Sequence, residues 1–304
     1  MTAASERLLV LLGPTASGKT KLAVAAARAL HGEILSADSR QVYRGLDLGS
    51  GKDLADYGEV PYHLIDLVAP TVEFSLFDFI RAFCTAFSAV AARGHLPILA
   101  GGSGLYLDAV VRGYTLTAAP PDPALRQQLA DLSLDALRAR LLELRPQQHN
   151  RTDLESRERL LRALEIAMAE RDGTGETLRL PPLRPRVYGL TWPRDELRRR
   201  IARRLKERLA AGLLDEVAGL HAAGVSWATL DFFGLEYRFV ARHLRGELTH
   251  NDLFQQLNSA IGQFAKRQET WFRRMQRQGV AIHWLDGRVD PLAELLADWR
   301  RHAP

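Results

Sequence analysis

The sequence contains a pattern that is typical of a loop that binds phosphate groups. Residues 13–20 read Gly-Pro-Thr-Ala-Ser-Gly-Lys-Thr and follow the apolar run 8–12. In such a loop the backbone N–H groups surround a diphosphate, the lysine neutralises its charge and the last hydroxyl binds Mg²⁺. The alternative is a glycine turn that only links a strand to a helix. We predict a diphosphate site formed by Gly13, Pro14, Thr15, Ala16, Ser17, Gly18, Lys19 and Thr20, with the Thr20 hydroxyl as the Mg²⁺ ligand.

An acidic residue at the end of a predicted strand, or its absence, helps to distinguish phosphoryl transfer from the departure of an intact diphosphate. Asp38 follows the apolar run 33–37, whereas the run 96–100 continues into Gly-Gly-Ser-Gly without a carboxylate. An ATPase or kinase needs an acid there to organise Mg²⁺ and the attacking group. We interpret its absence as a sign that the diphosphate departs intact. Asp38 alone could equally be a turn former or a helix cap.

The elements that must position these residues alternate along the first third of the chain. Short apolar runs at 8–12, 33–37 and 96–100 alternate with helical patterns at 21–30 and 77–92, which predicts an α/β fold with a parallel sheet flanked by helices. The carboxyl ends of parallel strands meet at one edge of a sheet. The turns 13–20, 38–41 and 101–104 should therefore form one site.

The character of the sequence changes after about residue 114. Long helical patterns at 124–144 and 154–170 predict a helical insertion domain over 115–185. The phosphate-loop core would then comprise 1–114 and 186–304. It would be completed by strands at 186–191 and 281–285 and by helices at 195–211 and 253–277.

Basic residues form three clusters in a chain with a net charge of +5. The range 194–208 carries eight Arg or Lys residues, and Trp271 and Phe272 lie within the second cluster. Any one cluster is usually a solvated helix face. Three clusters with interleaved aromatic residues favour a polyanionic partner, above all nucleic acid. The second and third clusters consist of Lys266, Arg267, Arg273, Arg274, Arg277 and of Arg151, Arg157, Arg159, Arg162.

Cysteine and hydropathy exclude other classes of protein. The single cysteine, Cys84, excludes an intramolecular disulfide framework and a zinc site built from cysteines, and we expect a buried, inert thiol. No apolar segment reaches the roughly 18 residues that a membrane span needs. We expect a cytoplasmic enzyme without a membrane partner.

Seven motifs follow one another along nearly the whole chain. They are the phosphate loop, Asp-Ser-Arg-Gln-Val-Tyr (38–43), Asp-Leu-Gly-Ser-Gly-Lys (47–52), Pro-Tyr-His-Leu-Ile-Asp (61–66), Gly-Gly-Ser-Gly-Leu-Tyr (101–106), Arg-Leu-Leu-Arg-Ala-Leu-Glu (159–165) and Lys-Arg-Gln-Glu-Thr-Trp-Phe-Arg (266–273). Together they resemble the motifs of the tRNA dimethylallyltransferases, also called tRNA isopentenyltransferases. Two segments depart from the family pattern, since Ser50-Gly51-Lys52-Asp53 replaces Thr-x-Lys-Pro and Gly234-Leu235-Glu236-Tyr237 replaces Gly-Tyr-Lys/Arg-Glu.

The resemblance implies a transfer of dimethylallyl from dimethylallyl diphosphate to N6 of the adenosine at tRNA position 37, 3′ of the anticodon, with release of diphosphate. Lys19 and Thr20 with Mg²⁺ would stabilise the leaving group, and Arg204 would contact it from the far side. Asp38 would be the general base for the amine. Ser103, which stands where the family usually has threonine, resembles a contact to the target nucleotide.

The resemblance also implies a surface that holds the anticodon stem-loop of tRNA while the adenine is flipped out of its stack. We expect the protein to act as a monomer. The alternatives are a small-molecule kinase with an arginine-rich lid, an adenylate isopentenyltransferase and a non-catalytic RNA-binding protein. The implied tRNA contacts are Asp38, Ser39, Arg40, Gln41, Ser103, Glu158, Arg159, Arg162, the turn 231–236 with Phe233 and Gly234, and Lys266, Arg267, Gln268 and Arg273.

Overall fold

The computed structural model describes residues 7–146 and 156–302 and divides the chain into two units. The first unit comprises the chain up to Gly113 and from Pro181 onward, and the second comprises Tyr114–Leu180. The second boundary lies before the predicted residue 185 because a strand of the first unit already begins at Arg184.

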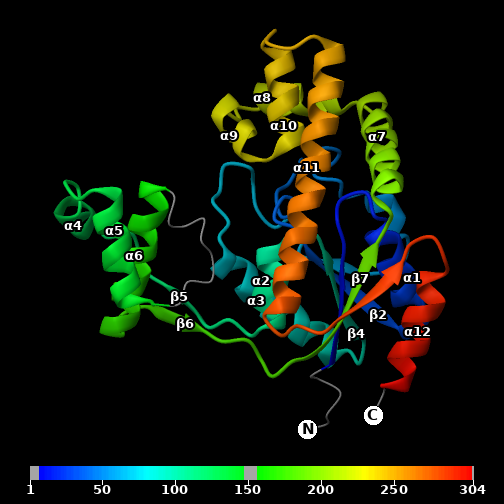
Figure 1. The fold of residues 1–304 in the computed structure, drawn as a ribbon, viewed down its shortest axis with the longest axis horizontal. Coiled ribbons are helices and arrows are strands. Elements are labelled where there is room, and N and C mark those ends of the chain that lie inside the picture. Colours follow the sequence, from blue (N-terminus) through cyan, green and yellow to red (C-terminus); the bar gives the residue numbers. More distant parts are fainter. Residues whose placement is uncertain (1–6, 147–155, 303–304) are drawn as a thin grey trace. The chain divides into compact units, whose positions relative to one another are not determined.

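A six-stranded parallel sheet forms the centre of the first unit (Figure 1). Its strand order is β3-β2-β4-β1-β7-β8, and every neighbouring pair is parallel. The predicted α/β fold is therefore confirmed; the two-residue strand β3 was not predicted. The strands are β1 (Arg7–Leu12), β2 (Gly32–Ala37), β3 (Tyr62–His63), β4 (Leu96–Gly101), β7 (Arg184–Thr191) and β8 (Ile282–Asp286).

Helices cover both faces of this sheet. Helices α1 (Lys19–Leu30) and α12 (Pro291–Arg301) share an apolar core with Leu9 and Leu11 of β1. Helices α2 (Leu76–Ala92) and α3 (Gly104–Val111) pack against each other, and α2 also contacts β4. The side chains of a strand alternate between its two faces, so the continuous apolar runs in the sequence reflect burial on both sides.

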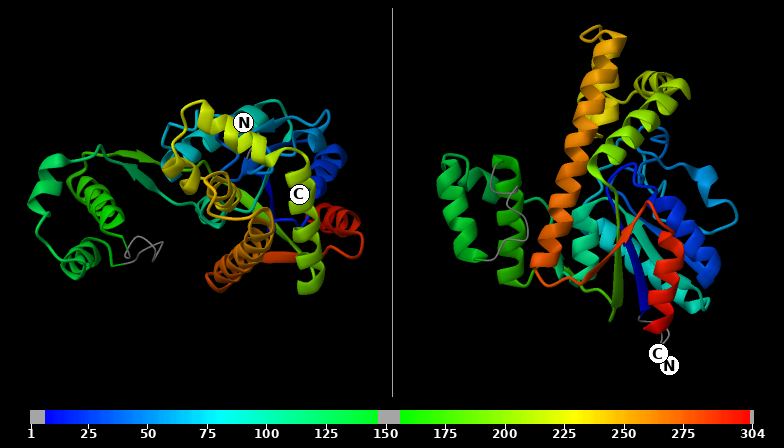
Figure 2. Two further views of the ribbon diagram at one scale, coloured as in Figure 1. Left: turned by 90° about the horizontal axis from the view of Figure 1, so that it is seen from above. Right: turned by 45° about the vertical axis from the view of Figure 1, so that its right-hand side comes forward.

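A further helical layer lies over the carboxyl ends of the strands (Figures 1 and 2). Its core joins residues of α7, α8, α10 and α11 to Val42 and Tyr43, which follow β2. The sequence predicted α7 and α11 but missed the three short helices between them. The layer consists of α7 (Arg194–Ala210), α8 (Leu213–Ala222), α9 (Trp227–Phe232), α10 (Leu235–Leu244) and α11 (His250–Arg277), and the short 3₁₀ helix η2 (Leu54–Tyr57) follows β2.

The second unit is a small helical body with an antiparallel pair of strands, β5 (Leu116–Ala118) and β6 (Glu176–Leu178). The predicted continuous helix over 124–144 is wrong. Helix α4 (Pro123–Gln128) ends early, and Ser133 caps a new helix, α5 (Leu134–Leu144), by accepting a hydrogen bond from the backbone N–H of Ala136. Helix α6 is described as Arg157–Asp172, and the predicted start at 154 lies outside the described residues.

The environment of Cys84 and the hydropathy of the helices bear on two of the sequence predictions. Cys84 lies on α2 and is half-buried, and burial raises the pKa of its thiol, which keeps the thiolate population small. Among the described helices, none has both the length and the apolar character that a bilayer crossing requires.

Glu33 is a buried charge at the opposite end of the sheet from the turns of the predicted site. It is 2% exposed and accepts hydrogen bonds from Arg93 at 2.6 and 2.9 Å. Ring nitrogens of His63 and His95 lie 2.6 Å from its carboxylate oxygens. The Arg93 hydrogen bond and, more weakly, the two histidines lower the pKa of Glu33 to about 2, against the opposing effect of burial.

Replacement of this carboxylate tests its contribution to folding. Glu33→Gln should lower the free energy of unfolding by about 2 kcal/mol at neutral pH, because it leaves the half-buried Arg93 guanidinium without its carboxylate partner. The folded-state pKa is depressed, so the contribution is complete above the unfolded pKa and disappears as the pH falls toward 2. Urea unfolding at pH 7 and at about pH 3 measures the difference in the free energy of unfolding between the wild type and the variant. An equal difference at the two pH values would contradict this assignment. Glu59→Gln, at an exposed ion pair with Arg28, is the control.

Candidate active site

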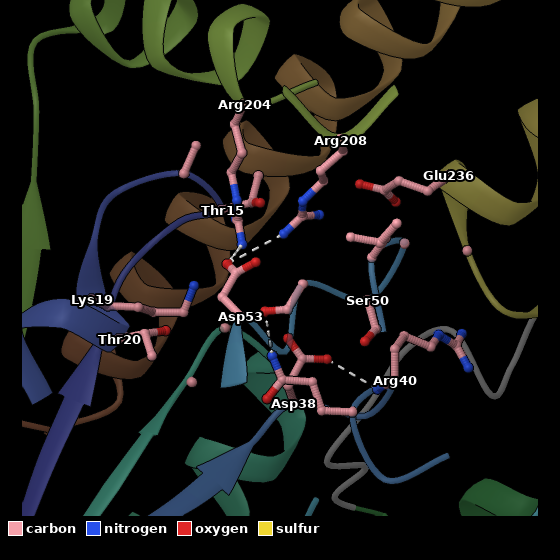
Figure 3. Close-up of a pocket in the computed structure, with 18 of the residues that line it drawn as sticks. Thr15, Lys19, Thr20, Asp38, Arg40, Ser50, Asp53, Arg204, Arg208 and Glu236 are labelled. Carbon is pink, nitrogen blue, oxygen red and sulfur yellow. Dashed lines mark hydrogen bonds and ion pairs between the residues drawn. The ribbon is translucent and has the colours of Figure 1, made fainter. Parts of the chain in front are cut away.

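A cavity of about 880 Å³ lies in the first unit at the carboxyl ends of the strands. Gly101 of β4 pairs with both Leu12 of β1 and Ala37 of β2, so the turns after these strands leave the sheet at one level. All three turns line the cavity, together with residues of α7, α10 and α11 (Figure 3). The structure thus brings together the three turns that the sequence indicated.

The phosphate loop is held in shape by residues that are distant in the sequence. Gly18 has a φ of 90°, a left-handed conformation that glycine adopts without strain. Trp192 donates to the carbonyl oxygen of Ser17 at 2.8 Å, and Arg200 donates to that of Ala16 at 2.9 Å. The backbone N–H of Thr15 donates to Gln268 at 2.8 Å. The loop therefore has a fixed shape before a ligand binds, which lowers the entropic cost of binding.

Lys19 projects into a strongly cationic environment. Burial and then the Arg204 charge lower the pKa of its ammonium to about 8, while Asp38 has the opposing effect. Its Nζ lies 3.5 Å from the carbonyl oxygen of Pro14. A cation that is partly desolvated and repelled by other cations gains most from an anionic ligand, because the ligand removes both penalties.

Thr20 is the residue available for the expected metal. Its side chain lines the cavity and forms no hydrogen bond within the described part of the chain. Residues 7–146 and 156–302 contain no group of three His, Cys, Asp or Glu side chains that could hold a metal by themselves. Mg²⁺ is commonly bound by one or two protein groups together with phosphate oxygens of the substrate, and the residues present fit such a site.

Asp38 combines the two roles that its sequence position left open. One carboxylate oxygen, Oδ1, accepts a hydrogen bond from the backbone N–H of Arg40 at 3.0 Å and so stabilises the turn. The other oxygen has no hydrogen bond in the described residues, and the side chain lines the cavity. A second acid, Asp286, also ends a strand, but its carboxylate pairs with Arg288 at 2.6 Å.

Helix α7 presents Arg200, Arg204 and Arg208 to the cavity at intervals of four residues. Arg204 forms an ion pair with Asp53 at 2.5 Å, and Arg208 lies 3.5 Å from the same oxygen (Figure 3). The basic cluster at 194–208 therefore divides between an exposed face and a cavity face. The sequence prediction included Arg204 but missed Arg208 and Asp53; the four-residue spacing from Arg204 was the signal for Arg208.

Three polar residues of the predicted tRNA surface form hydrogen bonds inside the protein. The Gln41 amide donates to the carbonyl oxygen of Gly51 at 3.0 Å and accepts from Ser36 at 2.7 Å. The Gln268 amide links Thr15 to the carbonyl oxygen of Gly102, to which it donates at 2.9 Å. Ser103 accepts from the backbone N–H of Ser39 at 2.9 Å. These bonds position the loops, and a contact of these residues with tRNA stays a prediction.

The predicted turn 231–236 is shorter than expected. Residues 231–232 end α9 and Glu236 already belongs to α10, which leaves only Phe233 and Gly234 between the helices. The Phe233 side chain is 1% exposed and packs against Tyr43, so its ring belongs to the core. Arg40 lies over the ring of Phe232 and lines the cavity.

The remaining predicted tRNA contacts are on two helices. Lys266, Arg267 and Arg273 are exposed on α11, and Arg267 also lines the cavity. In the second unit Glu158 and Arg159 are exposed on α6. Arg162 instead donates to Glu165 at 2.9 Å and to the carbonyl oxygen of Ala119 at 2.7 Å, and so supports the fold of that unit. Arg151 of the same basic cluster lies outside the described residues.

Comparison with known proteins assigns the chain to a family. The family model described as IPP transferase matches residues 41–275, and the model described as isopentenyl transferase matches residues 6–59. The chain belongs to the IPP transferase family. It is 64% identical over 290 residues to a tRNA dimethylallyltransferase 2 of Syntrophotalea carbinolica, covering 95% of this chain and 97% of that one. It is 59% identical to one of Trichlorobacter lovleyi, covering 94% of each.

A solved structure of this family has the same fold. The full-length tRNA isopentenylpyrophosphate transferase of Bacillus halodurans is similar over 97% of this chain and 95% of its own length, with 32% identity and a TM-score of 0.70. The match extends over both units of the chain. The resemblance inferred from the motifs is therefore confirmed at the level of the family.

The pKa of Lys19 predicts how this IPP transferase binds its diphosphate. Affinity for a prenyl diphosphate should fall as the pH rises through about 8, because free Lys19 loses its proton there. Lys19→Ala should bind on the order of tenfold more weakly at neutral pH and lose most of this pH dependence. Calorimetric titration across this range measures both. Parallel pH profiles of the two proteins would contradict the assignment of Lys19 to the donor site.

Proposed function

We propose that this IPP transferase moves a dimethylallyl group from dimethylallyl diphosphate to N6 of the adenosine 3′ of the anticodon in tRNA, and releases diphosphate. One observation carries the proposal. The same cavity is lined by a phosphate loop and by Asp38, whose second oxygen is available to a ligand. A donor bound at the loop and an acceptor amine at the carboxylate could thus meet in one cavity.

The donor end of the cavity stabilises the leaving group. When the C1–O bond of the donor breaks, its electron pair passes to the diphosphate, which gains negative charge. The loop N–H groups, Lys19 and Arg204 would face that charge, and fixed donors and cations in a partly desolvated site stabilise it strongly. No carboxylate follows β4, so nothing at this strand end organises water for attack on phosphorus.

A divalent cation, which we propose to be Mg²⁺, would be held by the Thr20 hydroxyl and the diphosphate oxygens. When bound, it supplies further charge neutralisation of the leaving group. The Thr20 hydroxyl lies in the first turn of α1, whose N–H groups would bind the diphosphate that this cation accompanies.

The acceptor end of the cavity provides a base. The exocyclic amine of adenine is a weak nucleophile, and its nitrogen becomes positive as the N6–C1 bond forms. The free oxygen of Asp38 would accept one N6 proton, which leaves a neutral secondary amine. The bond from the Arg40 N–H to Oδ1 holds the carboxylate in place and would leave its other oxygen available to the substrate.

The tRNA would be held mainly through its phosphates. Lys266 and Arg267 on α11 and Arg159 on α6 are exposed cations suited to this role. The adenine must leave its stack to enter the cavity, which places the contacts around the anticodon stem-loop. In this proposal the protein acts as a monomer in the cytoplasm.

Removal of the basic oxygen separates the two roles of Asp38. Asp38→Asn keeps an oxygen for the Arg40 N–H but loses the negative charge, so the turn should persist while the base is lost. The single-turnover rate of transfer should fall roughly 10²–10⁴-fold, with the affinities for tRNA and donor little changed. A well-folded variant that transfers at a near-normal rate would exclude Asp38 as the base.

Salt dependence of binding tests the tRNA surface. Neutralising Arg159, Lys266 and Arg267 one at a time should weaken tRNA binding and reduce the slope of log K against log salt by about one per phosphate contact. Arg162 is left unchanged because it supports the second unit. Arg199→Gln on the exposed face of α7 is the matched control. An unchanged slope in the triple variant would show that these residues form a solvated surface without phosphate contacts.

Product analysis tests the reaction itself. Purified protein, dimethylallyl diphosphate and tRNA should yield prenylated adenosine, detected by mass spectrometry of the digested nucleosides. Parallel reactions with AMP, or with ATP and small acceptors, should yield no product. Transfer to AMP but not to tRNA, or ATP-dependent phosphorylation, would contradict the proposal.

A further inference from the structure

Gly51 creates the space in which two arginines of α7 meet. Its φ is +70°, and a Cβ at this position would collide with the Nη2 atoms of both Arg204 and Arg208. The two guanidinium groups, one helical turn apart on α7, therefore converge on the same small volume beside the cavity (Figure 3). Two like charges brought together in this way repel each other unless an anion lies between them.

Arg208 is the less satisfied member of this pair. It is 8% exposed, and its Nε and Nη2 atoms have no hydrogen-bond partner in the described residues. Burial and the neighbouring Arg204 lower its pKa, which shows how unfavourable the position is for a cation. A guanidinium is charged at any physiological pH, so its unmet donors imply an anionic ligand that completes the site.

The nearest anions inside the protein are carboxylates. The Oδ2 atom of Asp53 lies 2.5 Å from Arg204 and 3.5 Å from Arg208, where an oxygen of a bound phosphate would also lie. Glu236 also interacts electrostatically with Arg208, but burial raises its pKa and so weakens it as a counter-ion. These two acids stand at the positions where the sequence departs from the family pattern.

We propose that Arg208 is a second cationic ligand of the diphosphate and that Asp53 occupies the ligand position until the diphosphate displaces it. The inference rests on the proposed function, since it concerns the same donor site. The charges of Arg204, Arg208 and Asp53 all act on Lys19, which places them around one volume. The side chain of Asp53 is 37% exposed, so its carboxylate can move into solvent when it is displaced.

Binding of inorganic diphosphate in the presence of Mg²⁺, measured by calorimetry, tests this arrangement. Arg208→Gln should weaken binding by about tenfold or more, because a charge-assisted contact is lost. Asp53→Asn should tighten binding, by roughly threefold to tenfold, because the competing negative charge is gone. Asparagine tolerates the positive φ of 47° at this position, so the loop is preserved. Arg199→Gln is the control on the exposed face of α7 and should bind as the wild type does.

The outcomes distinguish this inference from the proposed function. A wild type that prenylates tRNA, together with an Arg208→Gln variant that binds diphosphate normally, would overturn the inference alone. A wild type without transfer activity would overturn the proposed function, whatever the diphosphate affinities. A thermal melt identifies a variant that does not fold. If Arg208→Gln does not fold, Asp53→Asn provides the test, because unchanged or weaker diphosphate binding by that variant would overturn the proposed displacement of Asp53.

Discussion

The concentration of positive charge around one cavity is the constraint on which the rest of the first unit depends. Lys19 comes from the loop after β1, and Arg204 and Arg208 come from α7, far away in the sequence. Burial and mutual repulsion lower the pKa of both Lys19 and Arg208. The folded protein holds these cations together at a cost, and an anionic ligand offsets it. In the proposed mechanism this arrangement would stabilise the leaving diphosphate, whose negative charge removes the repulsion between the cations.

Rigid supports maintain this arrangement. The helix α11 brings Gln268 against both the phosphate loop and the turn after β4, so one amide sets the distance between two walls of the cavity. Trp192 and Arg200 hold the loop from the other side. The helical layer over the strand ends thus has two functions, since it carries the arginines and supports the loops that line the cavity.

The sequence predicted the sheet and the phosphate loop because both depend on local patterns. Continuous apolar runs identify strands that are buried on two faces, and the loop motif needs only eight adjacent residues. The pairing of Asp53 with Arg204 could not be predicted, because it joins two segments 151 residues apart through tertiary packing. Gln41 and Gln268 show the same limit, since the motif match that indicated tRNA contacts gave no sign of their hydrogen bonds to Gly51 and Gly102. The break between α4 and α5 was not predicted, because it depends on the capping hydrogen bond from the backbone N–H of Ala136 to Ser133.

A crystal structure of the protein with a non-reactive dimethylallyl thiodiphosphate and an anticodon stem-loop would show whether the leaving group and the acceptor amine meet between the phosphate loop and Asp38. We expect the diphosphate on the loop N–H groups and Lys19, with N6 of the flipped adenine roughly 2.6–3.2 Å from the free oxygen of Asp38. A diphosphate bound elsewhere, or an adenine amine too far from Asp38 for a direct or water-mediated hydrogen bond, would contradict the account.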